Sequence, residues 1–208
     1  MDRITRAIDQ LWGPISADGR LGPEPAFASE LEAQCDKRLG LVVSGVSKWS
    51  VGHQLEHLYL TSHYVLDRLI EAMSGQNSSK HMGPYGYGLM VGGFIPRGVF
   101  PTIPPLLPVS GTLVHILPLK DHLRRRLEEI TWDLDEVKAS TGKSRHPRMK
   151  YLTAVQWLYF AEIHHRHHLA IIRDICKVAD GTGTVFANMV LSTKQRAITV
   201  RPNKSLGD

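Results

Sequence analysis

The sequence predicts an all-α protein in which four long helices pack as a bundle, with a long crossover between the second and third helices and an extended C-terminal tail. Apolar residues recur at spacings of three and four along four segments, which is the period of a helix with one buried face. Residues suited to capping precede two of these segments. Glycine and proline are concentrated between the second and third segments, which indicates a loop.

The chain has 208 residues, of which 42% are hydrophobic, and we expect one helical domain over residues 1–180 and a tail over residues 181–208. No apolar run approaches the roughly 20 residues of a membrane span, so no membrane association is expected. The first residues lack the apolar core of a signal peptide, and Cys35 and Cys176 are too few for a disulfide framework. We therefore expect a cytoplasmic protein.

The formal net charge of +5 does not indicate a nucleic-acid partner. The basic run 124–126 is followed at once by Glu128 and Glu129, which is typical of a solvated helix face. Much of the remaining excess lies in the tail, where the basic residues are opposed only by Asp208. These tail residues are Lys194, Arg196, Arg201 and Lys204.

The first two helices are predicted over residues 26–43 and 51–73. Residues 44–47, which contain glycine and serine, end the first helix. Ser50 precedes the second helix, where its hydroxyl can accept an orphan backbone N–H, and Gly75 follows its end. The apolar positions that define the first helix are Phe27, Leu31, Cys35 and Leu39.

Residues 75–118 form the predicted crossover, with six glycines between Gly83 and Gly98 and seven prolines between Pro84 and Pro118. Long regular structure is not expected here, and a crossover of this length often covers a site. Its apolar residues indicate that it packs against the bundle. Its glycines lack the GxGxxG spacing of a nucleotide-binding loop.

The third and fourth helices are predicted over residues 119–139 and 154–178. In the third, leucines recur along one face and charged residues fill the other. Thr153 and Gln156 have the spacing of a capping box at the start of the fourth.

The fourth helix carries four of the eleven histidines within five consecutive positions. His164 and His168 are four residues apart, so they point the same way, and they lie in the middle of the apolar stripe. A buried imidazole without a partner costs about 1–3 kcal/mol. A divalent metal would satisfy both rings, and the alternative is hydrogen bonding to protein neighbours. A metal site would need at least a third ligand.

Several short motifs then occur in a recognisable order. Trp49-Ser50 is followed by His57, then by His146-Pro147, and the last helix carries the run His164-His165-Arg166-His167-His168. This pattern resembles the DinB/YfiT-like superfamily of metal-dependent proteins, over roughly residues 45–75 and 115–178. The resemblance implies that His57, His164 and His168 are metal ligands. Leu169-Ala170-Ile171 stand where the family usually has Arg-Gly-Gln.

The resemblance also implies a four-helix bundle, often dimeric, so we expect a homodimer. The metal would be Zn or Ni, with Fe as a third option, because imidazole suits all three. Characterised relatives use a low-molecular-weight thiol, so we expect a small-molecule substrate and a thiol of this kind. Glu56 and Glu162 are candidate general bases beside the histidines, and His53 is left open as a further ligand.

These expectations leave three functions to be separated. The first is a metal-dependent enzyme, either a thiol-dependent transferase or a hydrolase. The second is a non-catalytic stress-related or dimerisation bundle with a structural or vestigial metal, for which the site should be sealed. The third is a ferritin-like di-iron protein, which needs a Glu-x-x-His motif on each of two helices. Glu162 and His165 supply one such motif, but Gln54 stands at the corresponding place on the second helix.

Overall fold

The computed structural model describes residues 36–75, 79–131 and 133–182. The tail after residue 182 and most of the predicted first helix lie outside these ranges. In the described part of that helix, the prediction is wrong: only the 3-10 turn η1 (Asp36–Arg38) forms, and non-helical turns follow. The backbone carbonyls of Leu39 and Leu41 are used elsewhere, because they accept the N–H groups of Gly52 and Val51 at 2.8 and 3.0 Å.

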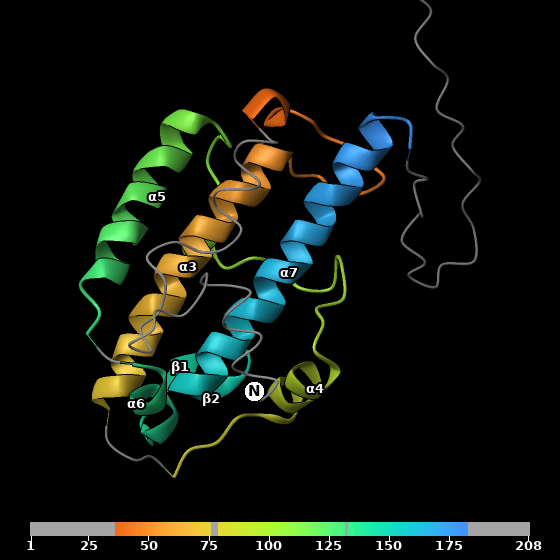
Figure 1. The fold of residues 1–208 in the computed structure, drawn as a ribbon. Coiled ribbons are helices and arrows are strands. Elements are labelled where there is room, and N and C mark those ends of the chain that lie inside the picture. Colours follow the sequence, from red (N-terminus) through yellow and green to blue (C-terminus); the bar gives the residue numbers. More distant parts are fainter. Residues whose placement is uncertain (1–35, 76–78, 132, 183–208) are drawn as a thin grey trace, which may run out of the picture.

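Three long helices organise the described residues. They are α3 (Val51–Ser74), α5 (Leu113–Glu128) and α7 (Ala154–Ala179), and α3 lies between the other two (Figure 1). Because α3 has neighbours on both sides, it is buried on most of its circumference. Bundle-like packing of three helices is therefore shown, whereas the predicted first helix, which would complete a four-helix bundle, falls largely outside the described ranges.

The predicted caps of the two longest helices are confirmed. The Ser50 hydroxyl accepts the backbone N–H of His53 at 3.2 Å at the start of α3. At the start of α7, the Thr153 hydroxyl accepts the backbone N–H of Gln156, and the Gln156 side chain accepts the N–H of Thr153. These hydrogen bonds satisfy backbone groups that a helix end leaves unpaired. They join residues within one turn, so the sequence alone could predict both helix starts.

The predicted third helix is two helices. α5 begins six residues earlier than expected and continues through Pro118, and it ends at Glu128. The separate helix α6 (Leu134–Ala139) follows after a break. Asp133 and Glu136 form a capping box at its start. The capping box stabilises the start of α6 at this point, so α5 does not continue through it.

A β-hairpin that the sequence did not predict precedes α7. Strands β1 (Lys143–His146) and β2 (Lys150–Thr153) pair antiparallel, and β2 runs directly into α7. Lys150 adopts a positive φ of 68° after the hairpin turn. Strands of four residues show too little alternation to stand out in a sequence dominated by helical periodicity.

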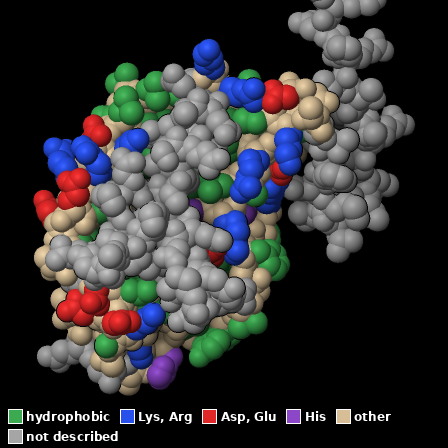
Figure 2. All heavy atoms as spheres, in the orientation of Figure 1, with side chains coloured by type: hydrophobic (Ala, Val, Ile, Leu, Met, Phe, Trp, Pro, Cys, Tyr) green, Lys and Arg blue, Asp and Glu red, His purple; other side chains and the backbone are tan. Residues whose placement is uncertain are grey.

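The crossover contains the helix α4 (Pro84–Gly92) and the 3-10 turn η2 (Pro104–Leu106). The prediction that its apolar residues pack against the helices is confirmed in part, because Leu89 and Met90 are buried whereas Val91, Phe94 and Val99 are exposed. Arg97 also pairs with Asp174 of α7 at 2.7 Å. On the face shown in Figure 2, basic and acidic side chains occur together over α5. No helix among the described residues is long and apolar enough to cross a membrane.

Candidate metal centre

Two helices bring three histidines to one point. His57 comes from the second turn of α3, and His164 and His168 come from successive turns of α7. One ring nitrogen from each lies within 4.8 Å of the corresponding nitrogens of the other two. The ring centroids are 4.5 to 5.1 Å apart. The structure therefore brings together the three residues that the sequence and the resemblance selected.

Hydrogen bonds orient two of the three rings. The Nδ1–H of His57 donates to the carbonyl of Leu106 at 2.7 Å, and the Nδ1–H of His168 donates to Oε1 of Gln54 at 2.5 Å. The Gln54 amide nitrogen in turn donates to the Ser47 hydroxyl at 2.9 Å. With the proton held on Nδ1, each ring presents the lone pair of its Nε2, which is how histidine ligands are commonly positioned.

The donor set fits a divalent metal. The Nε2 atoms of His57 and His164 are 3.3 Å apart. Tetrahedral zinc with bonds of about 2.0–2.1 Å separates two ligand nitrogens by about 3.3–3.4 Å. The Nδ1 of His164 is buried and has no hydrogen-bond partner among the described residues, so hydrogen bonding to protein leaves one nitrogen of this ring unpaired. A bound cation would take the Nε2 lone pairs of the three rings in place of the contact between His57 and His164.

Burial keeps all three imidazoles neutral. It lowers the pKa of His57, against a smaller opposing effect of the Leu106 carbonyl, and it lowers the pKa of His164 and His168 well below the usual value. Repulsion among the neighbouring rings adds to the effect on His164 and His168. A neutral imidazole is the form that binds metal, so the site is ready to bind at neutral pH without losing a proton from these rings.

Trp49 covers one side of the cluster. Its ring lies 5.0 Å from that of His57 and stacks 6.3 Å from that of His168. The tryptophan therefore shields the rings with an apolar surface and restricts their rotation. The Trp49-Ser50 pair therefore has two physical roles: Trp49 packs on the histidines, and Ser50 caps α3, the helix that carries His57.

The candidate general bases do not face the cluster. Glu56 is buried and accepts backbone N–H bonds from Val109, Ser110 and Gly111 at 2.9, 3.1 and 2.6 Å. Burial raises the pKa of Glu56, but these donors and His115 outweigh it, so the net pKa is lowered. Glu56 is thus an anchor for the end of the crossover.

Three further residues that the sequence singled out also have other partners. Glu162 forms an ion pair with Arg166 at 3.1 Å. The Nδ1 of His53 is bonded to the Ser50 hydroxyl at 2.7 Å, and His53 is not in the three-histidine group. His165 is buried against Ser62, with Nε2 2.9 Å from the hydroxyl, and burial lowers its pKa to about 3.

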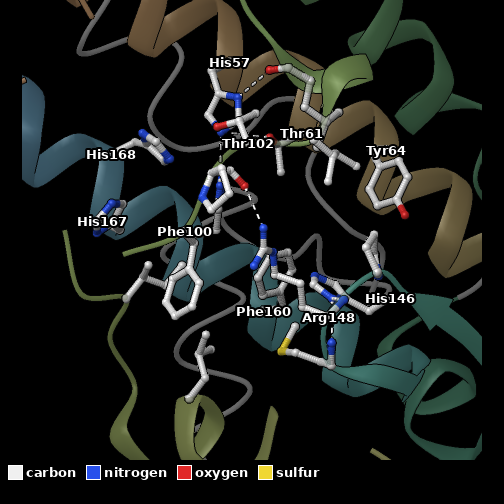
Figure 3. Close-up of a pocket in the computed structure, with 18 of the residues that line it drawn as sticks. His57, Thr61, Tyr64, Phe100, Thr102, His146, Arg148, Phe160, His167 and His168 are labelled. Atoms are coloured by element: carbon white, nitrogen blue, oxygen red, sulfur yellow. Dashed lines mark hydrogen bonds between the residues drawn. The ribbon is translucent and has the colours of Figure 1, made fainter. Parts of the chain in front are cut away.

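A pocket of about 160 Å³ opens beside the three histidines. The crossover, the hairpin turn and α7 supply most of its wall, which is largely apolar (Figure 3). His167 also lines it, at 4.9 Å from the His168 ring, although its position on the helical wheel placed it on another face. The described residues therefore leave space beside the three histidines and do not seal the site. This volume would accommodate several waters or a small molecule.

The family follows from a comparison over most of the chain. The family model of the DinB superfamily matches residues 5–172. The chain belongs to the DinB superfamily. No curated protein and no solved structure gives a match. The resemblance seen in the sequence motifs is thus confirmed, and membership of the DinB superfamily extends across the crossover as well as the two motif-bearing regions.

Sequence reasoning missed the groups that orient the ligands. The Leu106 carbonyl carries no side-chain signal and comes from a loop 49 residues beyond His57. Gln54 could have been noticed, because it is a polar residue three positions before His57 on the buried side of α3 and must find a hydrogen-bond partner there. Its position in the sequence does not show which partner. In this DinB-superfamily chain, its amide oxygen joins the two ligand-bearing helices by accepting a hydrogen bond from the Nδ1–H of His168.

Proposed function

We propose that this protein is a metal-dependent enzyme in which His57, His164 and His168 hold a divalent cation at the inner end of a substrate pocket. The observation that carries the proposal is the convergence of three neutral imidazoles at the wall of an open cavity. A structural or vestigial metal would need no such cavity. The openness of the pocket therefore favours the catalytic alternative over the non-catalytic one.

The donor set suits Zn or Ni, and Fe is also compatible with imidazole. Three neutral ligands leave a divalent cation its full charge, so a water or thiol bound at an open position would lose its proton near neutral pH. The chain's own residues hold the ligands in place: the Leu106 carbonyl and Gln54 keep the protons of His57 and His168 away from the cavity. The apolar wall excludes bulk water and favours a small apolar substrate.

Transfer to a thiol fits this site better than hydrolysis. Among the described residues that line the pocket, none carries a carboxylate. Activating water commonly relies on a general base of that kind, as in metalloproteases. A thiol loses its proton more easily than water does and, once deprotonated, is already a strong nucleophile. We therefore propose a thiol-dependent transferase, with a low-molecular-weight thiol as the second substrate.

The test begins with metal content. Purified full-length protein should contain close to one Zn, Ni or Fe per chain by elemental analysis, and removal by a chelator should abolish turnover of electrophiles in the presence of thiols. His57→Ala and His164→Ala should each lose the metal, because two imidazoles cannot complete the site.

His53→Ala is the matched control, because it removes an imidazole one turn away on the same helix. It should keep wild-type metal content and turnover. Metal-free wild-type protein, or full metal occupancy in His164→Ala, would reject the metal site. Full occupancy with no binding or turnover of any thiol would instead support the non-catalytic bundle.

A further inference from the structure

The pocket has a second polar group of residues on the hairpin turn. His146, the last residue of β1, and Arg148, in the turn between β1 and β2, line the cavity. In Figure 3 they lie at the end of the view opposite His57 and His168, with Phe100 and Phe160 nearby. The cavity therefore has the three histidines at one end, an apolar middle and a basic group at the other.

The backbone of the hairpin turn sets the protonation state of His146. The Nδ1 of His146 accepts the backbone N–H groups of Arg148 and Met149, each at 3.1 Å. A nitrogen that accepts two hydrogen bonds cannot carry a proton, so the ring proton is on Nε2. Contacts with Trp157 and Phe160 hold the ring in place, at centroid distances of 5.2 and 4.8 Å. His146 thus presents one rigid N–H donor.

Arg148 is a cation without a carboxylate partner in the described part of the chain. Its Nη2 donates to the Pro101 carbonyl at 3.2 Å, and its guanidinium lies over the Phe100 ring at 5.6 Å. These contacts fix the side chain against the crossover and use one of its five N–H donors. The remaining donors keep the planar fork that binds a carboxylate at two points.

We propose that Arg148 and the Nε2–H of His146 form an anion-binding subsite for the carboxylate of an amphipathic substrate. The substrate's apolar body would occupy the middle of the cavity, and its reactive end would reach the three histidines. The assignment of a reactive end rests on the proposed function, whereas carboxylate binding itself requires no metal. Arg148 supplies a positive charge, and His146 supplies a hydrogen-bond donor in a fixed orientation. The charge makes the subsite bind anions more tightly than neutral compounds of the same shape.

The experiment uses metal-free full-length protein, so that a carboxylate cannot bind through a cation. 3-Phenylpropionate and its neutral counterpart 3-phenylpropionamide are titrated by calorimetry. The wild type should bind the carboxylate at least about tenfold more tightly than the amide, as expected for charge-assisted hydrogen bonds. Arg148→Gln should remove this preference and leave amide binding within about twofold, because the apolar contacts remain.

One further variant is a charge control and another tests the second member of the subsite. Arg145→Gln removes the same charge from β1 of the hairpin, at a residue that does not line the pocket, and should behave as wild type. His146→Asn keeps an acceptor for the two backbone N–H groups of the turn and removes the ring donor, so it should weaken carboxylate binding while thermal stability holds.

Equal binding of the two probes to the wild type would overturn the subsite, as would an Arg148→Gln protein that keeps the preference. Loss of carboxylate preference in Arg145→Gln as well would show only a general charge effect and would also overturn it. These outcomes are independent of the proposed function, which fails separately if the native protein contains no metal.

Discussion

The helix pair α3–α7 and the crossover between α3 and α5 contribute different things to the site. The helices supply all three imidazoles, and the Gln54 that orients His168 also lies on α3. The crossover supplies no ligand, but its Leu106 carbonyl orients His57, and its residues build much of the pocket wall. The helices therefore fix where the ligands lie and how His168 is oriented, whereas the irregular backbone of the crossover orients His57 and shapes the access to the site.

The contact between these two regions should be the most sensitive point of the fold. A Cβ at Gly52 of α3 would lie 1.8 Å from the backbone oxygen of Gly111, at the end of the crossover. The added methyl group would collide with the backbone of the crossover, which cannot move aside without shifting that segment or α3. Gly52→Ala should therefore lower the free energy of unfolding by about 3 kcal/mol. Urea unfolding of metal-free protein measures this.

Gly88→Ala is the matched control, because it adds a methyl group to a helical glycine of α4 that has nothing within 4 Å of the added atom. It should be neutral or stabilise by up to about 1 kcal/mol. A Gly52→Ala protein as stable as the wild type would mean that the crossover does not pack against α3 as described.

The second prediction concerns the anchor of the crossover. Glu56→Gln replaces a carboxylate that accepts three backbone N–H groups with an amide that has one acceptor atom. It should cost about 2 kcal/mol of stability at pH 7, because buried donors lose their partners. The exposed Glu71 on the same helix is the control, and Glu71→Gln should change stability by less than about 0.5 kcal/mol.

The pH dependence of this anchor has a definite sign. The pKa of Glu56 is lowered in the folded state, so its stabilisation is fully present above its ordinary pKa of about 4.3. It is lost as the pH falls through the lowered folded-state value. The difference in stability between wild type and Glu56→Gln should therefore shrink in acid. A difference that is unchanged down to pH 2 would contradict the role of the charged carboxylate.

The third prediction tests the hydrogen bond by which α3 orients a metal ligand, independently of the hydrogen bond from the crossover. Gln54→Leu removes the acceptor for the Nδ1–H of His168 but keeps all three ligands. Metal affinity should fall by at least about tenfold, as is common when the partner of a ligating histidine is lost. Competition with a chromogenic chelator measures this. Gln54→Glu keeps an acceptor and should retain affinity, and equal affinity in Gln54→Leu would show that the amide does not orient the ring.

Local chemistry explains what could be predicted. Ser50, Thr153 and Gln156 act within one helical turn, so the starts of α3 and α7 were evident from sequence. The break between α5 and α6 was missed although its capping residues, Asp133 and Glu136, are also local. The apolar period runs across the break without interruption, and no glycine or proline marks it.

Sequence periodicity and caps predict the helices α3 and α7, and helical geometry pairs His164 with His168, because residues four apart lie on one face. Periodicity did not select His57, which the family motif supplied, because α3 is buried on most sides and has no single inner stripe. Which atoms orient the imidazoles and which residues form the pocket depend on how the elements pack together. Leu106, His146 and Arg148 reach the site across long stretches of chain, and no local rule relates residues that meet only when the elements pack.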